Sequence, residues 1–240
     1  MVSVIIPTRS LKRKKNLKYI YKKIYSITDL YNSLYMLENI EIIAIINGNK
    51  DLELINFVEK NKFHKYTIIN QNSGVSRAWN IGRQLSEGEY LLFINDDVIL
   101  ESNSIDLMVN EFIKNDNLAI VGPQGSIWKN GKHFEFANEY NISEVNVISG
   151  FCFMVKTSYF DEIGGFDTFY TPAGFEEIDF CFMATKKGFD LKVLSNLKIY
   201  TEPVHGISGK NEDILYFDKK INTIDLNERN SKYFKKKWNF

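Results

Sequence analysis

Four short runs of apolar residues divide the first hundred residues of the chain into a repeating pattern. Each run is continuous rather than alternating, and helix-like segments separate one run from the next. Continuous apolar strands are typical of a parallel sheet that is covered on both faces. The repetition of strand and helix therefore predicts a doubly wound α/β fold. The predicted strands are 2–6, 42–46, 66–69 and 90–94, and the predicted helices are 17–37, 51–60 and 76–85.

The second half of the chain has a less regular pattern. It contains no internal repeat and no low-complexity linker, so nothing in it marks a domain boundary. We therefore predict one domain over 1–240, with a nucleotide-binding half at 1–100, an acceptor-side half at 101–210 and a helical extension at 211–240. The predicted elements are helices at 102–114, 175–187 and 211–238, strands at 118–121 and 145–155, and a loop or hairpin at 126–144.

Composition excludes several classes of protein. Lys and Arg together number 30, as do Asp and Glu, so the basic excess of a nucleic-acid binder is missing. No apolar run reaches the roughly 20 residues that a membrane-spanning helix needs. No secretory leader precedes the first strand, so we expect a cytoplasmic protein. Cys152 and Cys181 lie among apolar residues and are expected to be buried free thiols.

An acidic cluster follows the fourth apolar run directly, at Asn95, Asp96 and Asp97. In open α/β sheets, ligands bind at the carboxyl ends of the strands. Two adjacent carboxylates there are costly unless a cation or solvent compensates their charge. Mg²⁺ and Mn²⁺ suit carboxylate oxygens and also bridge diphosphates. The alternative interpretation is a tight turn or a helix cap, where Asn and Asp are common.

Other motifs occur in a fixed order around this cluster. The ordered series resembles the large inverting glycosyltransferase family 2, whose members have the GT-A fold, a Rossmann-like and mostly parallel sheet flanked by helices with a smaller mixed acceptor-side region. The resemblance implies transfer of a hexosyl or deoxyhexosyl group from a nucleotide diphosphate donor to a hydroxyl acceptor, with Mn²⁺ or Mg²⁺, in polysaccharide or glycoconjugate synthesis. The motifs that carry it are 2–8, 41–51, 72–82, 88–97, 149–152, 164–167, 176–179 and His205.

The resemblance implies a donor site in the first half of the chain. Many relatives have an acidic residue at the end of the second strand, but here Ile46 stands there, followed by Asn47. The base is therefore left open among UDP, dTDP and GDP donors. From the residues alone, Pro7 is explained equally by strand termination and Asp51 by a helix cap. The donor-binding residues that the resemblance implies are Pro7, Thr8, Arg9, Asn47, Asp51, Asn72, Gly74, Asn80, Asn95 and Asp96.

The metal and the catalytic base are implied in the same way. Asp97 matches the metal ligand, with Asp96 and His205 as further ligands. Glu177 matches the carboxylate that takes the proton of the acceptor hydroxyl, and Glu176 would orient the acceptor. The alternative for the glutamates is compensation of a helix dipole. The alternative for His205 is a histidine that is hydrogen-bonded locally.

The acceptor side is the least constrained by sequence. Trp128, Phe151 and Phe175 are candidates to line it, although most aromatic residues must be in the core. The resemblance implies a saccharide, a lipid-linked or a protein hydroxyl as the acceptor. The tail 232–238 is basic and aromatic, and would allow a peripheral contact with an anionic membrane surface. A solvated helix end is the alternative for this tail.

Two further functions fit parts of the pattern. A sugar nucleotidyltransferase has a similar fold but usually opens with a glycine-rich phosphate loop, which residues 7–10 lack. A catalytically inactive nucleotide-sugar binding module needs no acidic catalytic residues. The presence of Asp96, Asp97 and Glu177 therefore argues against such a module.

Overall fold

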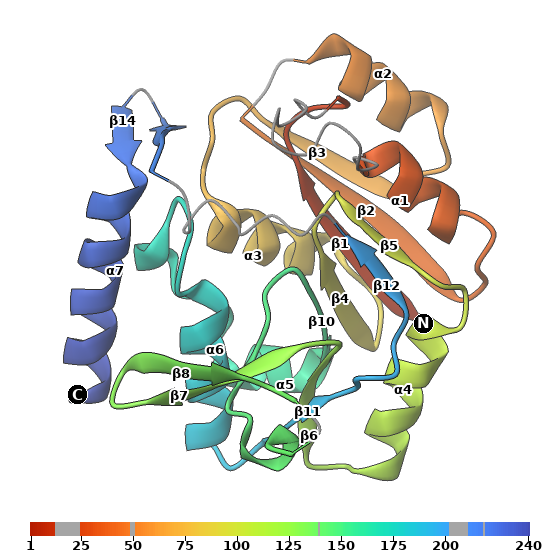
Figure 1. The fold of residues 1–240 in the computed structure, drawn as a ribbon. Helices are drawn as coiled ribbons and strands as arrows, with labels where there is room; N and C mark the ends of the chain where they lie inside the picture. Colours follow the sequence, from red (N-terminus) through yellow and green to blue (C-terminus); the bar gives the residue numbers. More distant parts are fainter. Residues whose placement is uncertain (13–24, 49–50, 139, 202–210, 218) are drawn as a thin grey trace.

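The computed structural model describes residues 1–12, 25–48, 51–138, 140–201, 211–217 and 219–240 (Figure 1). A seven-stranded sheet in the order β11-β6-β10-β4-β1-β2-β3 forms its centre. Strands β4, β1, β2 and β3 run parallel, as the sequence predicts, and β10 runs antiparallel between β4 and β6. The strands are β1 (Val2–Thr8), β2 (Ile40–Asn47), β3 (Lys65–Ile69), β4 (Tyr90–Ile94), β6 (Leu118–Gly122), β10 (Cys152–Lys156) and β11 (Asp190–Val193).

Helices cover both faces of this sheet, which explains why its strands are continuously apolar. Along β1, Val4 and Ile6 pack into one apolar cluster and Ile5 into the other. The first cluster includes residues of α1 (Ile27–Leu34), α2 (Leu52–Lys60) and α4 (Ser104–Lys114). The second includes residues of α3 (Val75–Leu85), α5 (Thr157–Ile163), α6 (Glu176–Lys186) and α7 (Thr223–Trp238). The predicted doubly wound architecture is therefore confirmed.

A smaller three-stranded sheet, β8-β7-β9, lies beside the central sheet on the side of α6 and α7 (Figure 1). Its strands are β7 (Gly125–Lys129), β8 (Lys132–Phe136) and β9 (Val147–Ile148). Strands β7 and β8 form the hairpin expected within 126–144. Two minor pairs complete the fold, β5 (Val98–Leu100) with β12 (Ile199–Thr201) and β13 (Asp213–Tyr216) with β14 (Lys219–Asn222).

Two predicted elements differ from the structure. The strand expected at 145–155 is two strands, β9 and β10, because the chain leaves the small sheet at 149–151 and enters the central one. The helix expected at 211–238 begins only at Thr223, after the hairpin β13–β14. Its start is fixed by Asn222, whose side chain accepts a hydrogen bond from the backbone N–H of Ile224.

The helix expected at 17–37 is seen as α1 in its C-terminal part, while 13–24 lie outside the described residues. Asp29 accepts a hydrogen bond from the backbone N–H of Ser26, which helps to fix the first turn of α1. Cys152 and Cys181 are buried free thiols, as predicted. In the part of the chain that the structure describes, every helix is too short or too polar to cross a bilayer.

Candidate active site

The acidic cluster lies where two adjacent parallel strands end. Strands β1 and β4 are neighbours, so Thr8 at the end of β1 comes close to the turn that follows β4. The Thr8 hydroxyl donates a 2.7 Å hydrogen bond to a carboxylate oxygen of Asp96, and both side chains are buried. The backbone N–H of Val98 bonds to the carbonyl of Asn95 and closes the turn. The carboxylates are thus held at the carboxyl edge of the sheet.

The side chains at this turn that could bind a metal ion are carboxylates, which are oxygen ligands. Asp96 is buried and Asp97 half-buried, and both belong to the turn between β4 and β5. Within the described ranges, no three His, Cys, Asp or Glu side chains are arranged to hold a metal ion, and His205 lies outside those ranges. Mg²⁺ is usually bound by one or two carboxylates and completes its shell with water and phosphate oxygens. Two carboxylates on one turn fit an ion of that kind.

The loop between β3 and α3 is built around two buried asparagines. Asn47, at the end of β2, accepts hydrogen bonds from the backbone N–H and the hydroxyl of Ser73. Its amide nitrogen donates to the carbonyl of Gly74. Asn72 accepts from the backbone N–H of Gly74 and donates to the carbonyl of Leu215 in β13. Both side chains therefore shape the loop at the start of α3.

Gly74 occupies a position that only glycine fits. Its φ is +87°, and a Cβ there would lie 2.6 Å from the side chain of Thr171. Arg77 of α3 donates to the hydroxyl of Thr171 at 3.0 Å and also to Tyr216 in β13. The loop on the predicted donor side therefore touches the segment that leads to the glutamate pair.

The remaining predicted donor residues have varied surroundings. Asp51 caps α2 by accepting from the backbone N–H groups of Glu53 and Leu54, and it also accepts from Leu11 in the loop after β1. Asn80 of α3 makes two hydrogen bonds with the backbone of Phe166, at 2.9 and 3.0 Å. It therefore holds the chain in place at Phe166. Pro7 is half-buried and Arg9 is exposed at the end of β1.

The second acidic pair begins helix α6. Phe175, just before it, has a φ of +78°, a left-handed conformation that costs a non-glycine residue about 1–3 kcal/mol. Glu176 is buried, and its Oε2 has no hydrogen-bond partner among the described residues. Burial, together with the nearby Glu177 carboxylate, raises the pKa of Glu176 well above its ordinary value. Burial also raises the pKa of Glu177. Such buried, poorly satisfied carboxylates at a strained turn are typical of functional sites.

Helix α7 holds the segment that leads into this pair. The fully buried Asn230 donates to the carbonyls of Tyr170, Ala173 and Gly174 at 3.1, 3.1 and 2.8 Å. One guanidinium nitrogen of Arg229 donates to the carbonyl of Thr171. The turn before Glu176 is therefore fixed from outside by side chains of the C-terminal helix.

The tail 232–238 belongs to the same helix and packs against the domain. Phe234 is fully buried, and the ring of Tyr233 stacks on Phe169 with centroids 3.8 Å apart. Lys237 pairs with Asp167 at 2.8 Å and with Asp179 at 2.7 Å. These tail residues are engaged in contacts within the chain.

A cavity of about 340 Å³ opens beside Glu177. Trp128 and Phe175, two of the residues expected on the acceptor side, line this cavity. Phe151, the third, is not in its lining and packs against the apolar cluster on the other face of the sheet. His133, Phe136 and Asn227 also line the cavity, and no motif in the sequence points to them. The full lining is Ser126, Trp128, His133, Phe136, Val147, Ser149, Gly174, Phe175, Glu177, Ile178 and Asn227.

The segment 149–151 links the two acidic groups. A Cβ placed on Gly150 would lie 3.0 Å from Cδ of Glu177, so the glutamate side chain rests on this glycine. The next residue, Phe151, accepts a 2.9 Å hydrogen bond from the backbone N–H of Asn95. The turn that carries Asp96 and Asp97 is therefore connected to Glu177 through two consecutive residues.

Comparison with known sequences shows which family the chain matches. A profile described as glycosyl transferase family 2 matches residues 3–164. The chain is 26% identical over 166 residues to the poly-beta-1,6-N-acetyl-D-glucosamine synthase of Staphylococcus epidermidis, covering 62% of this chain and 40% of that protein. It is 26% identical over 162 residues to the chondroitin synthase of Pasteurella multocida, covering 52% of this chain and 17% of that protein. The chain thus spans less than half the length of these relatives.

Solved structures show the same fold. The mannosyltransferase PcManGT from Pyrobaculum calidifontis, in complex with GDP-Man and Mn²⁺, has a TM-score of 0.62 at 15% identity, over 87% of this chain and 59% of that one. GalNAc-T7 with UDP, GalNAc and Mn²⁺ has a TM-score of 0.66 at 13% identity, over 83% and 44%. The S. aureus protein TarS with UDP-GlcNAc has a TM-score of 0.56 at 20% identity, over 81% and 56%. The predicted GT-A fold is confirmed, and the profile match over more than half of its residues shows that the chain belongs to glycosyl transferase family 2.

Proposed function

We propose that this chain is an inverting, metal-dependent glycosyltransferase that moves a sugar from a nucleotide diphosphate donor to a hydroxyl acceptor. One observation carries the proposal: the segment 150–151 contacts Glu177 at one residue and the turn of Asp96 and Asp97 at the next. A cation-binding turn and a carboxylate base are the two parts that such a reaction requires. The cavity beside Glu177 gives an acceptor a place to enter.

The donor side comprises the loop after β1 and the turn after β4. Asp97 and Asp96 would hold Mn²⁺ or Mg²⁺, with His205 as a third ligand in the proposal. The ion would supply charge stabilisation for the departing nucleotide diphosphate. Thr8 holds one Asp96 oxygen in place, while Asn47 and Asn72 shape the adjoining loop. The proposed donors are UDP-, dTDP- or GDP-linked sugars, the class to which the ligands GDP-Man and UDP-GlcNAc of the solved neighbours belong.

On the acceptor side, Glu177 is the proposed base. Its carboxylate takes the hydroxyl proton while the acceptor oxygen bonds to the anomeric carbon and the bond to the diphosphate breaks. A single displacement of this kind inverts the anomeric centre. A raised pKa makes Glu177 a stronger base than an ordinary glutamate. Burial, and then the charge of Glu177, raises the pKa of Glu176 well above its ordinary value.

The decisive test replaces the proposed base without changing its size. We expect Glu177→Gln to lower transfer by at least about a hundredfold, because general base catalysis typically contributes 10²–10⁴-fold. Its affinity for nucleotide diphosphates with Mn²⁺, measured by thermal shift, should stay within a factor of about two. A variant with wild-type transfer would remove Glu177 from the role. A wild-type protein that binds sugar nucleotides but never turns them over would instead be a binding module.

A further inference from the structure

An irregularity in the hairpin β7–β8 determines which side chains face the cavity. Trp128 pairs with His133, but the preceding residue of β7, Ile127, pairs with Glu135, so Phe134 is an extra residue in β8. Side chains alternate along a regular strand, which would place His133 and Phe136 on opposite faces. The extra residue brings both to the cavity face. Bulges are frequent next to active sites, where they redirect a side chain.

Three hydrogen bonds hold Trp128 in place at this bulge. The Asn146 side chain accepts a hydrogen bond from the backbone N–H of Trp128 and donates to its carbonyl, at 2.8 and 2.9 Å. The indole N–H donates to the hydroxyl of Ser126 at 3.0 Å. Because Asn146 and Ser126 satisfy the polar atoms of Trp128, the indole ring is a preset apolar wall.

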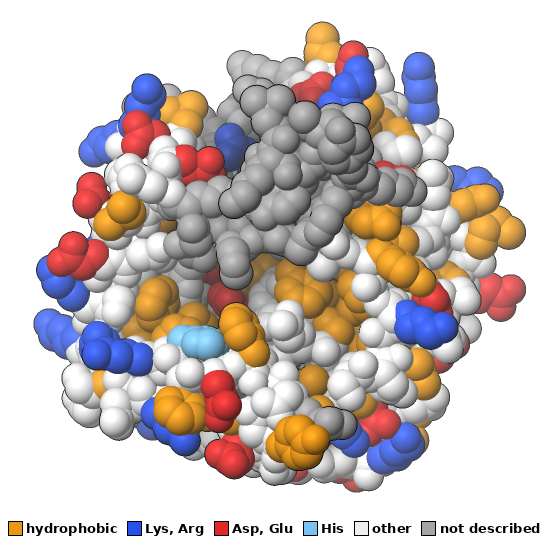
Figure 2. All heavy atoms as spheres, viewed as in Figure 1, with side chains coloured by type: hydrophobic (Ala, Val, Ile, Leu, Met, Phe, Trp, Pro, Cys, Tyr) orange, Lys and Arg blue, Asp and Glu red, His pale blue; other side chains and the backbone are white. Residues whose placement is uncertain are grey.

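The cavity lining combines aromatic rings with small polar groups. The rings of Trp128 and His133 meet edge to face. The ring centroids of His133 and Phe136 are 4.5 Å apart, and the Phe136 residue is 55% exposed. Figure 2 shows hydrophobic side chains and a histidine gathered over this hairpin. Ser149 and Asn227 add hydrogen-bonding groups. A partly exposed aromatic wall and a few polar groups in one cavity suit a ligand with one apolar face and several hydroxyls.

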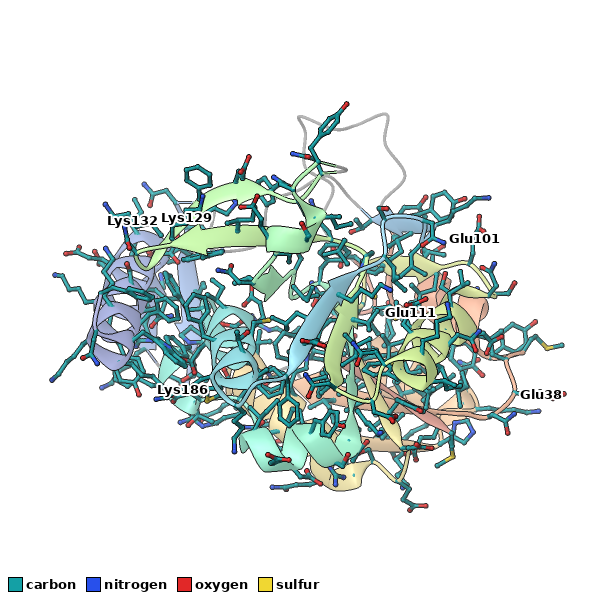
Figure 3. All side chains as sticks on the ribbon, turned by 90° about the horizontal axis from the view of Figure 1, so that it is seen from below. Glu38, Glu101, Glu111, Lys129, Lys132 and Lys186 are labelled. Carbon is teal, nitrogen blue, oxygen red and sulfur yellow. The ribbon has the colours of Figure 1, made fainter. Side chains whose placement is uncertain are left out.

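The charges around the cavity restrict the ligand further. Among the described lining residues there is no Lys or Arg, and Glu177 is the one carboxylate. The nearby Lys129 and Lys132 lie at the tip of the hairpin, beside α7 (Figure 3), and neither lines the cavity. An anionic group would therefore meet the Glu177 carboxylate with no Lys or Arg among the described lining residues to compensate it.

We propose that this cavity binds a neutral pyranose of a saccharide acceptor, with the apolar face of the sugar against Trp128 and His133. The sugar hydroxyls then face Ser149, Asn227 and Glu177. The role of this sugar as acceptor rests on the proposed transferase function. The site selects against uronic acids and against acceptors without a sugar ring.

The experiment uses matched ligand pairs. Saturation-transfer NMR, with the chain, Mn²⁺ and UDP or GDP present, compares methyl β-glucoside with methyl β-glucuronide and methyl β-galactoside with methyl β-galacturonide. N-acetylserinamide represents a protein hydroxyl. We expect a neutral glycoside to bind and its uronate partner to bind at least about fivefold more weakly. Trp128→Ala and His133→Ala should each weaken neutral sugar binding by about five- to tenfold, the loss expected for one aromatic contact.

Phe134→Ala is the control, because Phe134 lies in the same strand, is 57% exposed and does not line the cavity. It should bind the sugar like the wild type. His133 is exposed, so its variant tests the proposal even where Trp128→Ala loses stability. Equal binding of a uronate, binding of serinamide alone, or sugar binding that is unchanged in both variants would overturn the proposal. Sugar binding without donor turnover would support the sugar site and contradict the transferase reaction. Donor turnover without sugar binding would support the transferase reaction and contradict the sugar site.

Discussion

The side-chain amide of Asn230 donates a 2.8 Å hydrogen bond to the carbonyl of Gly174, just ahead of Glu176 in the chain. The same amide nitrogen reaches the carbonyls of Tyr170 and Ala173, so its two N–H groups are shared among three backbone acceptors. Removing it leaves buried polar groups without partners. Helix α7 therefore controls both the stability of this turn and the position of the glutamates.

For Asn230→Ala we expect a loss of about 1–3 kcal/mol in the free energy of unfolding. Because the turn is released, kcat should fall more than stability alone explains. Urea unfolding and steady-state transfer assays measure the two effects. Ile105→Val in α4 is the control. It removes a methylene from the apolar cluster on the other face of the sheet and should lower the free energy of unfolding by about 0.5–1.5 kcal/mol. Equal kcat values for the two variants would contradict a positioning role.

Gly150→Ala tests the contact beneath Glu177. The new Cβ would lie 3.0 Å from Cδ and 3.1 Å from Cγ of Glu177, so the glutamate must shift by a few tenths of an ångström. We expect kcat to fall on the order of tenfold, because small misplacements of catalytic groups are costly. Nucleotide binding should be unchanged. In Gly164→Ala, the added Cβ meets open space at a φ of +101°, so stability should fall while kcat stays at the wild-type value.

Asp97→Asn tests the proposed cation site. Replacing a half-buried carboxylate by an amide should leave folding nearly intact but raise the Mn²⁺ concentration that gives half-maximal donor turnover by about tenfold or more. A Mn²⁺ titration of donor hydrolysis measures this. Asp106→Asn, an exposed residue in the first turn of α4, should behave like the wild type. An unaltered Mn²⁺ requirement in Asp97→Asn would exclude that residue as a ligand.

Glu176→Gln tests the pH dependence of stability. Because the pKa of Glu176 is raised in the folded state, its contribution to stability is fully present below the unfolded pKa of about 4.3. That contribution is lost as the pH rises through the raised folded pKa. A glutamine has no charge to bury, so the variant should match the wild type near pH 4 and melt a few degrees higher at pH 8. Thermal unfolding across this range measures it. If the difference in melting temperature between the two proteins were the same at every pH, Glu176 would not be the group responsible for the pH dependence of stability.

The parallel half of the sheet and its acidic edge could be predicted from the sequence, because burial on both faces leaves a direct signal. Strand β2 is buried along its whole length, and its residues 42–46 form an unbroken apolar run. The position of Asp96 follows from the rule that parallel strands end at one edge. Glu177 could be selected as a candidate base only through the family resemblance, because a glutamate at the start of a helix is equally explained by the helix dipole.

The part of the cavity wall formed by His133 and Phe136 could not be predicted, because it depends on a register shift. Nothing local marks Phe134 as an extra residue, and without that shift His133 would face away from Trp128. The hairpin β13–β14 was mistaken for helix because β13 and β14 are only four residues each and stand directly before the long helix α7. The role of Asn230 depends on a contact with residues about 60 positions earlier in the chain, which periodicity does not reveal.

The antiparallel direction of β10 has a consequence for how such a protein diversifies. Since β10 starts at the edge where the parallel strands end, all of 123–151 is an excursion between two neighbouring sheet strands, β6 and β10. That excursion contains the β7–β8 hairpin and its bulge. Insertions or exchanges within it would redesign recognition of the second substrate while the strands that carry Thr8 and Asp96 stay unaltered.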